Sequence, residues 1–425
     1  SVARLCWSTA INSSQQISVN GYAVKKKLAE VGSKIDNYIN RLNIYSDHIA
    51  ADNLYRYVNG LQMAKNITDN HIASLELTGE HAHDSTLIVH DGFAYCVFTS
   101  SASGDNAGSD VARVILSKVE IANPANRTDY TVAADGMTLD GIVMDGGAGS
   151  PNMYLVGDVL HILFAAHVTG YYTILHCEFN TASPGLANYT EVTLNGYTLN
   201  NAALNTIFGT SYPESAFMNM QANSTIGEDT VDITTIYYIG LCWGYGTGKS
   251  IIVSTTDLVN WTVLTDVDFG ITPVFELACY CKDGYLYVAQ RPMYPNSNES
   301  STTLSASIAN GILAKYDITN DKFIDVTAIM NCSSRPAFFE LNDRLYLLTN
   351  PRTRSDLDVI RIYEDQLKGS SVVAQMKGGL NYPCVFVVGS TLYLSHSGND
   401  LELSSFTIDT ISDDDIAGLF SSLLV

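Results

Sequence analysis

One pattern recurs along most of the chain and limits the folds that it can adopt. Each copy has four or five apolar residues, a turn of two or three residues, and a second strand-like run that usually contains an L/F-x-Y triplet. Two such runs around a short turn are typical of a β-hairpin. The copies begin near residues 85, 152, 216, 276, 336 and 383. In the third copy, an acidic polar insertion separates residues 216–222 from residues 232–244.

The intervals between these hairpins, about 50 to 70 residues, leave room for two more strands in each unit. The candidates are residues 111–121, 171–179, 249–255, 311–318, 359–363 and 401–408. A four-stranded unit repeated at this period is typical of a propeller blade, and a closed ring of blades has no open sheet edges. The sequence therefore predicts an all-β, six-bladed β-propeller over residues 72–410, in which residues 72–79 close the ring against the sixth blade.

A different periodicity precedes the predicted propeller. Apolar residues alternate spacings of four and three without a break at Val24, Leu28, Val31, Ile35, Tyr38, Leu42, Tyr45 and Ile49. A seam sustained over several heptads indicates a coiled coil. We expect a helical stalk over residues 22–66 that joins chains through residues 22–49, most simply as a homotrimer. The seam could instead lie on the chain's own globular body, although a helix packed on a globular core usually has a wider apolar stripe.

Beyond these parts lie a polar N-terminal segment, residues 1–21, and a C-terminal tail, residues 411–425. The net charge of −21 argues against a nucleic-acid partner, which requires a basic surface. There is no apolar run of membrane-spanning length and no visible signal peptide, so we expect no membrane insertion. Only 16% of residues are charged, and the 25 Tyr with abundant Asn, Ser and Thr suit carbohydrate recognition.

The metal-ligating residue types do not form a recognisable motif. The eight Cys are scattered, and most lie in strand-like runs, so we expect buried free thiols and no zinc site. His81 and His83 would share one face of a strand and could meet a metal ion there, but ordinary polar contacts are the simpler interpretation. We expect neither a metal nor another cofactor.

The hairpin of residues 276–291 places opposite charges at its two ends. Glu276 opens its first run, Lys-Asp-Gly forms the turn at residues 282–284, and Arg291 closes its second run. The ends of a tight hairpin lie close together, so this carboxylate and guanidinium are predicted to meet at one end of a sheet. They indicate part of a site, or alternatively a solvent-exposed ion pair of little energetic value.

The stretch Ser254–Trp261, STTDLVNW, resembles the Asp-box turn of sialidases. It also resembles the S-x-D-L-x-x-W turn of five-bladed arabinanase- and xylosidase-type glycosidases. In such a turn Asp257 would accept backbone N–H groups while Trp261 packs on the blade, a structural role rather than a catalytic one.

The resemblance to sialidases extends to the order of four residues: Glu276, Arg291, Arg335 and Tyr382. It implies that Glu276 draws the phenolic proton of Tyr382 to make a nucleophile, and that Arg291 and Arg335 clamp a substrate carboxylate. Where sialidases carry a third arginine, this chain has His83 and Asp84. The candidates for the acid/base are Asp105 and Asp110.

The resemblance to arabinanase-type enzymes implies other roles for some of these residues. Asp84 would be the base, Glu276 the acid, and Asn152 would stand where a middle Asp tunes them. Such a pair can invert a glycosidic centre when about 6.5–9.5 Å apart. A propeller that binds glycan in the same pocket without catalysis is a further possibility, and we expect weak or absent hydrolysis of sialosides.

The combined layout resembles that of a bacteriophage tail-fibre or receptor-binding protein. A coiled-coil stalk would carry a head that binds cell-surface carbohydrate in a central pocket. The ligand contacts would come from His83, Asn152, Arg291 and Arg335. The expected location is extracellular or on a virion. The alternative is an exo-acting glycoside hydrolase of a bacterium or phage, with Asp84, Glu276 and Tyr382 as its catalytic residues.

Overall fold

The computed structural model describes the predicted propeller but not the segments on either side of it. The described residues are 65–67, 70–102, 112–211, 221–222, 226–231, 234–243, 249–267, 269, 274–292, 311–329, 332, 334–350, 356–377, 380–397 and 401–407. The heptad seam at 24–49 and the predicted homotrimer contact therefore lie outside them, as do residues 1–21, residues 411–425, Asp105 and Asp110. Among the described residues, no helix is long and apolar enough to cross a membrane.

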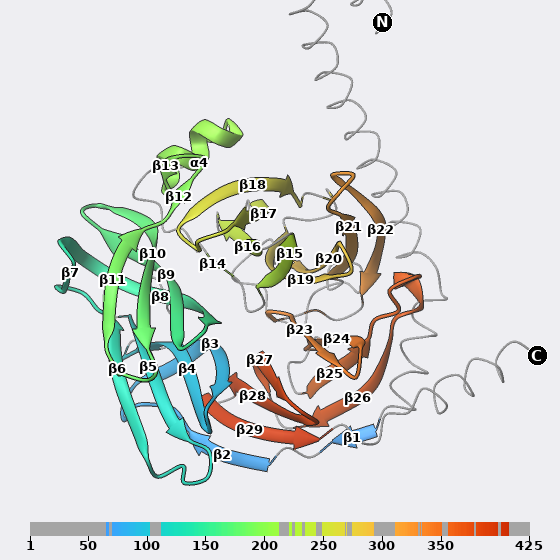
Figure 1. The fold of residues 1–425 in the computed structure, drawn as a ribbon, viewed down its shortest axis with the longest axis horizontal. Coiled ribbons are helices and arrows are strands. Elements are labelled where there is room, and N and C mark those ends of the chain that lie inside the picture. Colours follow the sequence, from blue (N-terminus) through green and yellow to red (C-terminus); the bar gives the residue numbers. More distant parts are fainter. Residues whose placement is uncertain are drawn as a thin grey trace, which may run out of the picture.

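The described strands form six sheets arranged in a ring (Figure 1), which confirms the predicted six-bladed propeller. Blade one contains β3 (His81–His90), β4 (Phe93–Ser101), β5 (Arg113–Glu120) and β6 (Arg127–Ala133). Blade two contains β7 (Thr138–Leu139), β8 (Ile142–Val156), β9 (Val159–Val168), β10 (Tyr171–Asn180) and β11 (Leu186–Glu191). Blade four contains β19 (Val274–Lys282), β20 (Tyr285–Pro292), β21 (Gly311–Asp317) and β22 (Lys322–Ile329).

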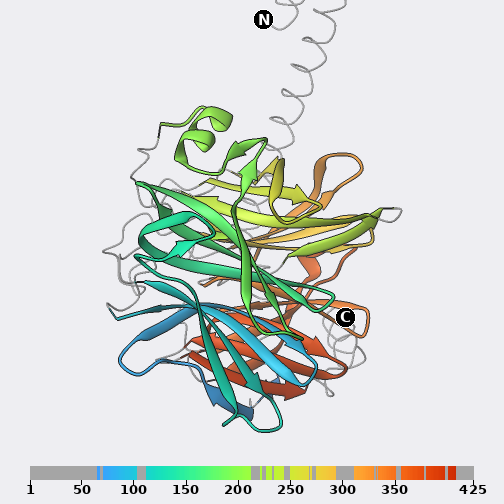
Figure 2. The ribbon, with the colours of Figure 1, turned by 60° about the vertical axis from the view of Figure 1, so that its left-hand side comes forward.

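Blade three is the most elaborate sheet. It contains β12 (Thr193–Leu194), β13 (Tyr197–Thr198), β14 (Gln221–Ala222), β15 (Gly227–Val231), β16 (Thr234–Trp243), β17 (Lys249–Thr255) and β18 (Asn260–Asp266). Strand β15 lies within the acidic polar insertion predicted between residues 222 and 232. It pairs with β16, so part of that insertion is sheet. Helix α4 (Asn201–Phe208) lies at the outer rim beside β12 and β13 and protrudes from the ring when the molecule is turned (Figures 1 and 2).

Segments from both ends of the described chain complete the last two blades. Blade five contains β23 (Ala337–Leu341), β24 (Arg344–Thr349), β25 (Asp356–Arg361), β26 (Ser371–Lys377) and β1 (Lys65–Ile67), with the short 3-10 helix η1 (Leu367–Gly369) before β26. Blade six contains β27 (Asn381–Val388), β28 (Thr391–Ser397), β29 (Leu401–Thr407) and β2 (Asn70–Ser74). The antiparallel pairing of β2 with β29 confirms the predicted closure of the ring, because strands from its beginning and end share one sheet.

The core of the molecule lies between the blades. Each seam between neighbouring blades holds one hydrophobic cluster of described residues, including the seam between blades six and one. Six of the cysteines, at positions 96, 177, 242, 279, 332 and 384, are buried free thiols, and Cys281 is half-buried. The prediction of buried thiols is therefore confirmed for the described residues other than Cys281.

The turn that resembles an Asp box has the predicted structural role. Asp257 Oδ1 accepts the N–H groups of Val259 at 2.9 Å and Asn260 at 2.7 Å. Trp261 is buried in the seam between blades two and three, and its Nε1–H donates to the Leu258 carbonyl oxygen at 3.0 Å. The turn is thus closed by the carboxylate on one side and anchored by the indole on the other.

Candidate functional site

Four inner strands contain a bulge, near the first residues of β3, β19 and β27 and midway along β8, and the bulges carry the predicted site. The register shifts lie between His83 and Thr86, Gly149 and Asn152, Val274 and Leu277, and Asn381 and Cys384. Asp84, Ser150 and Tyr382 lie in three of these bulges with φ values of 54°, 50° and 49°. Positive φ is costly for residues other than glycine, and bulges re-aim side chains. The same irregularity in several blades therefore indicates a functional end of the ring.

Arg335 connects the blades at this end. It precedes β23 and is 1% exposed. Its Nη2 lies 3.2 Å from Asp84 Oδ1 in blade one, and its Nε lies 4.0 Å from Glu276 Oε1 in blade four. Neither contact has hydrogen-bond geometry, and all three guanidinium nitrogens lack a hydrogen-bond partner in the described part of the chain. The buried guanidinium thus holds two carboxylates while several N–H donors remain unused.

Glu276 and Arg291 meet as the sequence predicted. Arg291 Nη1 donates a hydrogen bond to Glu276 Oε2, across the ends of the β19–β20 hairpin. The alternative of a solvent-exposed pair is wrong, because the Glu276 side chain is only 3% exposed and that of Arg291 only 12%. Burial strengthens such a contact, and it makes the loss of either partner costly because the other charge is left unpaired.

Asp84 is surrounded by groups that stabilise its negative charge. Its Oδ2 accepts a hydrogen bond from the Ser150 hydroxyl at 3.3 Å and lies 3.4 Å from His83 Nδ1. Burial on its own would raise the pKa of this carboxyl, but the charge of Arg335, followed by His83 and Ser150, holds the pKa well below its usual range. Asp84 is therefore ionised over the whole physiological range, and it suits a hydrogen-bond acceptor rather than a proton donor.

The remaining predicted residues lie in the same region. The rings of Tyr382 and His83 are tilted at 50° with centroids 6.5 Å apart, which places the Tyr382 ring near the residue that precedes Asp84. Asn152 is buried next to the blade-two bulge, and its Oδ1 accepts the Met153 N–H at 2.8 Å. The hydrogen bond expected between Glu276 and Tyr382 stays a prediction, and so do the catalytic roles of these residues.

Ser150 and Asn350 are part of the arrangement but were not predicted from the sequence. The Ser150 N–H donates to Thr99 Oγ1 at 2.8 Å, which fixes the bulge against blade one. Asn350 is buried, accepts the Ser334 hydroxyl and donates to the Leu380 carbonyl oxygen, so it ties the segment before Arg335 to the segment before Tyr382.

One sequence signal would have found Ser150. It precedes Pro151, just as Arg335 precedes Pro336 and Tyr382 precedes Pro383. Proline restricts the conformation of the residue before it, so a repeated X-Pro at the start of an inner strand marks this end of the blade.

The ring also encloses a cavity of about 420 Å³, further along the inner strands than the bulges. Its lining includes Leu87, Tyr154, Tyr280, Phe338 and Val385, each of which comes two to four positions after a site residue in the chain. The cavity is therefore distinct from the charged cluster around Arg335.

No family profile matches this sequence, and no curated protein matches it. Solved structures do match the ring. Trypanosoma rangeli sialidase in complex with sialic acid aligns with a TM-score of 0.52 at 10% identity, over 85% of this chain and 59% of the other. The fold is that of the sialidases. The same sialidase in complex with the inhibitor DANA aligns with a TM-score of 0.51 at 12% identity, over 84% of this chain and 59% of the other.

The match confirms the sialidase-like six-bladed propeller that the residue patterns predicted. At this level of identity the likeness concerns the fold. This chain spans less than two thirds of the length of the sialidase, so the activity of that protein is not carried over with the fold. The five-bladed arrangement of arabinanase-type enzymes does not apply, because the ring has six sheets.

Proposed function

We propose that this sialidase-like propeller is a glycan-recognising head that binds cell-surface carbohydrate at the Arg335 end of the ring. The heptad seam at residues 24–49 supports its place in an oligomeric fibre-like protein of the bacteriophage tail-fibre or receptor-binding type, acting outside the cell or on a virion. The observation that carries the proposal is the charge pairing at the centre of the ring.

Both arginines of the site already contact carboxylates. Arg291 pairs with Glu276, and Arg335 lies against Asp84 and Glu276, so two positive and two negative side chains balance. A ligand carboxylate would compete with these acids for the same guanidinium groups. A neutral sugar does not, because its hydroxyls can donate to the carboxylates and accept from the unused N–H donors of Arg335.

The position of Asp84 also acts against an anionic sugar. A charge-assisted contact to a carboxylate contributes about 1.5–3 kcal/mol, so a carboxylate at this position in place of a third arginine costs on the order of tenfold to a few hundredfold in affinity for a sialoside. The site therefore favours neutral glycans, with Tyr382 and His83 as the ring surfaces beside it.

An exo-acting glycoside hydrolase is the second candidate, because the carboxylates of Asp84 and Glu276 both lie against the Arg335 guanidinium. Two carboxyl groups that flank a glycosidic bond can act as a base and an acid. In this case Asp84 would take a proton from the attacking water and Glu276 would protonate the leaving oxygen, whereas in a sialidase-like reaction Tyr382 would be the nucleophile.

A glycan array and a panel of chromogenic sialosides, arabinosides, xylosides and galactosides, both run on the full chain, test the proposal. We expect binding of neutral glycans with weak or absent sialoside hydrolysis. Asp84→Asn and Tyr382→Phe should each weaken binding by about tenfold or more, because each removes a hydrogen-bonding group at the ligand. Tyr197→Phe is the matched control, since Tyr197 is 53% exposed on β13.

Two results would change the conclusion. Robust sialoside turnover that disappears in Tyr382→Phe would overturn the preference for neutral ligands. Turnover of a pentoside that disappears in Asp84→Asn would establish the hydrolase instead of the binding head.

A further inference from the structure

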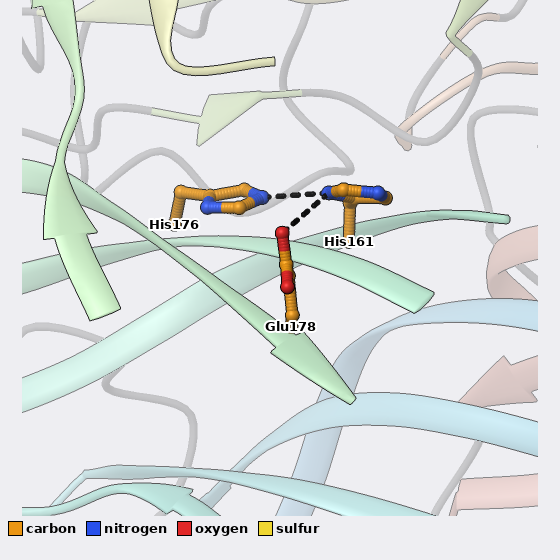
Figure 3. Close-up of side chains that lie close together, drawn as sticks. All are labelled: His161, His176 and Glu178. Atoms are coloured by element: carbon orange, nitrogen blue, oxygen red, sulfur yellow. Dashed lines mark hydrogen bonds and ion pairs between the residues drawn. The ribbon is translucent and has the colours of Figure 1, made fainter. Parts of the chain in front are cut away.

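A second cluster of polar side chains lies on β9 and β10 of blade two (Figure 3), and it contains none of the residues around Arg335. His161 on β9 is directly opposite Glu178 on β10, and His176 is two residues before Glu178 on the same face. Neighbouring residues of that face, Ile174 and Leu163, pack in the hydrophobic cluster between blades two and three. The cluster therefore lies at the seam between these two blades.

The three side chains converge on one point. His161 Nδ1 lies 2.9 Å from His176 Nε2 and 3.9 Å from Glu178 Oε1, and the three ligand atoms all lie within 4.8 Å of one another. Figure 3 shows the Glu178 carboxylate directed toward the His161 ring, which faces the His176 ring. Zinc binds nitrogen and oxygen at about 2.0–2.2 Å, so tetrahedral ligand atoms are about 3.3–3.5 Å apart. The His161–His176 and His161–Glu178 separations each differ from these values by about half an ångström.

His176 is the buried member of the pair. The residue is 3% exposed, and its Nδ1 is buried without a hydrogen-bond partner in the described part of the chain. Coordination of a metal ion through Nε2 would use the lone pair of the nitrogen that faces His161. Asp257 is the other nearby acid, but its Oδ1 already accepts two backbone N–H groups of its own turn.

We propose that His161, His176 and Glu178 form a Zn²⁺ site, with water in the fourth position. Two imidazole nitrogens and one carboxylate oxygen suit zinc, whereas Mg²⁺ and Ca²⁺ require mainly oxygen ligands. The His161 and Glu178 side chains are 17% and 32% exposed, so the ion can enter from solvent. The bound ion would crosslink β9 and β10 and stabilise the folded chain by mass action.

This inference goes against the expectation of no metal drawn from the sequence. His161 and His176 come from neighbouring strands of one blade and are 15 positions apart, so no short metal-binding motif contains them. The inference does not depend on the carbohydrate site, because the two clusters share no residue.

Zinc binding by the full chain, stripped with a chelator, tests the proposal by calorimetry and by elemental analysis after dialysis. We expect one zinc per chain at this site, a tetrahedral spectrum with Co²⁺, and a melting temperature raised by Zn²⁺ but not by Mg²⁺. His161→Gln and Glu178→Gln should each lose at least about 100-fold in zinc affinity, since outer-shell partners alone contribute 10–100-fold. Both side chains are partly exposed, so the fold of each variant can be verified by circular dichroism.

Two control variants make the test specific. His167→Gln changes another histidine of β9 that contacts Asp145 instead of this cluster, and it should retain full zinc affinity. His90→Gln disrupts the exposed group of His90, Asp91 and Asp158 and should also leave this site intact. Zinc binding that survives both His161→Gln and Glu178→Gln, or that is lost in His90→Gln alone, would overturn the proposal.

Discussion

Arg335 is the residue on which the centre of the ring depends most. It is buried, contacts carboxylates from blades one and four, and has N–H donors without partners among the described residues. Burial would lower the pKa of its guanidinium, but Asp84 and Glu276 raise it, so the charge is retained. Truncation of either partner in such a buried pair typically costs 3–5 kcal/mol, because the remaining charge loses its compensation.

The lowered pKa of the Asp84 carboxyl predicts that the stability of the fold depends on pH. Its pKa in the folded chain lies below the unfolded value of about 3.9, so the folded state binds this proton less readily than the unfolded state. The carboxylate therefore stabilises the fold fully above about pH 4, and this contribution is lost as the pH falls further. Between pH 6 and pH 3 we expect the free energy of unfolding to fall by about 1 kcal/mol more in the wild type than in Asp84→Asn.

Urea unfolding at a series of pH values measures this difference. The matched control is Asp343→Asn, which changes a carboxylate whose side chain is 92% exposed and should retain the slope of the wild type. Equal slopes for the wild type and Asp84→Asn would show that Asp84 is not held ionised by Arg335.

At the scale of strands, close packing between blades limits which residues are tolerated. Gly240 on β16 of blade three lies against Leu277 on β19 of blade four. A Cβ atom at Gly240 would overlap the Leu277 side chain, with its Cγ at 2.7 Å. The absence of a side chain at this position lets the two strands pack with Leu277 between them.

Gly240→Ala is therefore expected to destabilise the chain by about 1–3 kcal/mol, the usual cost of overpacking a core. Gly185→Ala is the matched control, because a Cβ there meets only the Ser183 carbonyl oxygen at 3.9 Å. Chemical denaturation of both variants measures the cost. A Gly240→Ala chain as stable as the Gly185→Ala chain would show that the seam between blades three and four adjusts without strain.

At the scale of the whole molecule, the ring is closed by segments distant in sequence. Strand β2 pairs with β29, and β1 pairs in parallel with β26, so residues before blade one complete blades five and six. The described part of the chain therefore begins in these two blades. A stalk formed by residues 22–49 would join the head through these strands.

We expect the full chain to be trimeric, with the seam residues of 22–49 buried between chains. Ile35→Lys places a charge in the predicted seam and should reduce the mass measured by light scattering to that of one chain. Lys34→Ala changes a residue outside the seam and should leave the assembly intact. A wild-type chain that is already monomeric would exclude the coiled-coil interpretation.

Local patterns in the sequence were enough to predict the blades. The hairpin repeat and the Asp-box turn each depend on residues close together in the chain, and the structure contains both. The ring-closing segment could be predicted for another reason, because a ring of blades leaves no open sheet edge. The same holds for the ends of the inner strands, where Asp84, Glu276 and Tyr382 lie, because blade strands start at regular intervals. The pairing of Glu276 with Arg291 could also be predicted, since a hairpin brings its own ends together.

The contacts between blades were decided by the tertiary structure alone. Arg335 meets Asp84 across 251 positions of sequence, and no local pattern states which carboxylate a buried guanidinium will reach. The bulge that turns Ser150 toward Asp84, and the pairing of β9 with β10 that joins His161 to His176, depend on strand register. A shift of one residue in register would turn these side chains to the opposite face, so only the folded ring determines which of them meet.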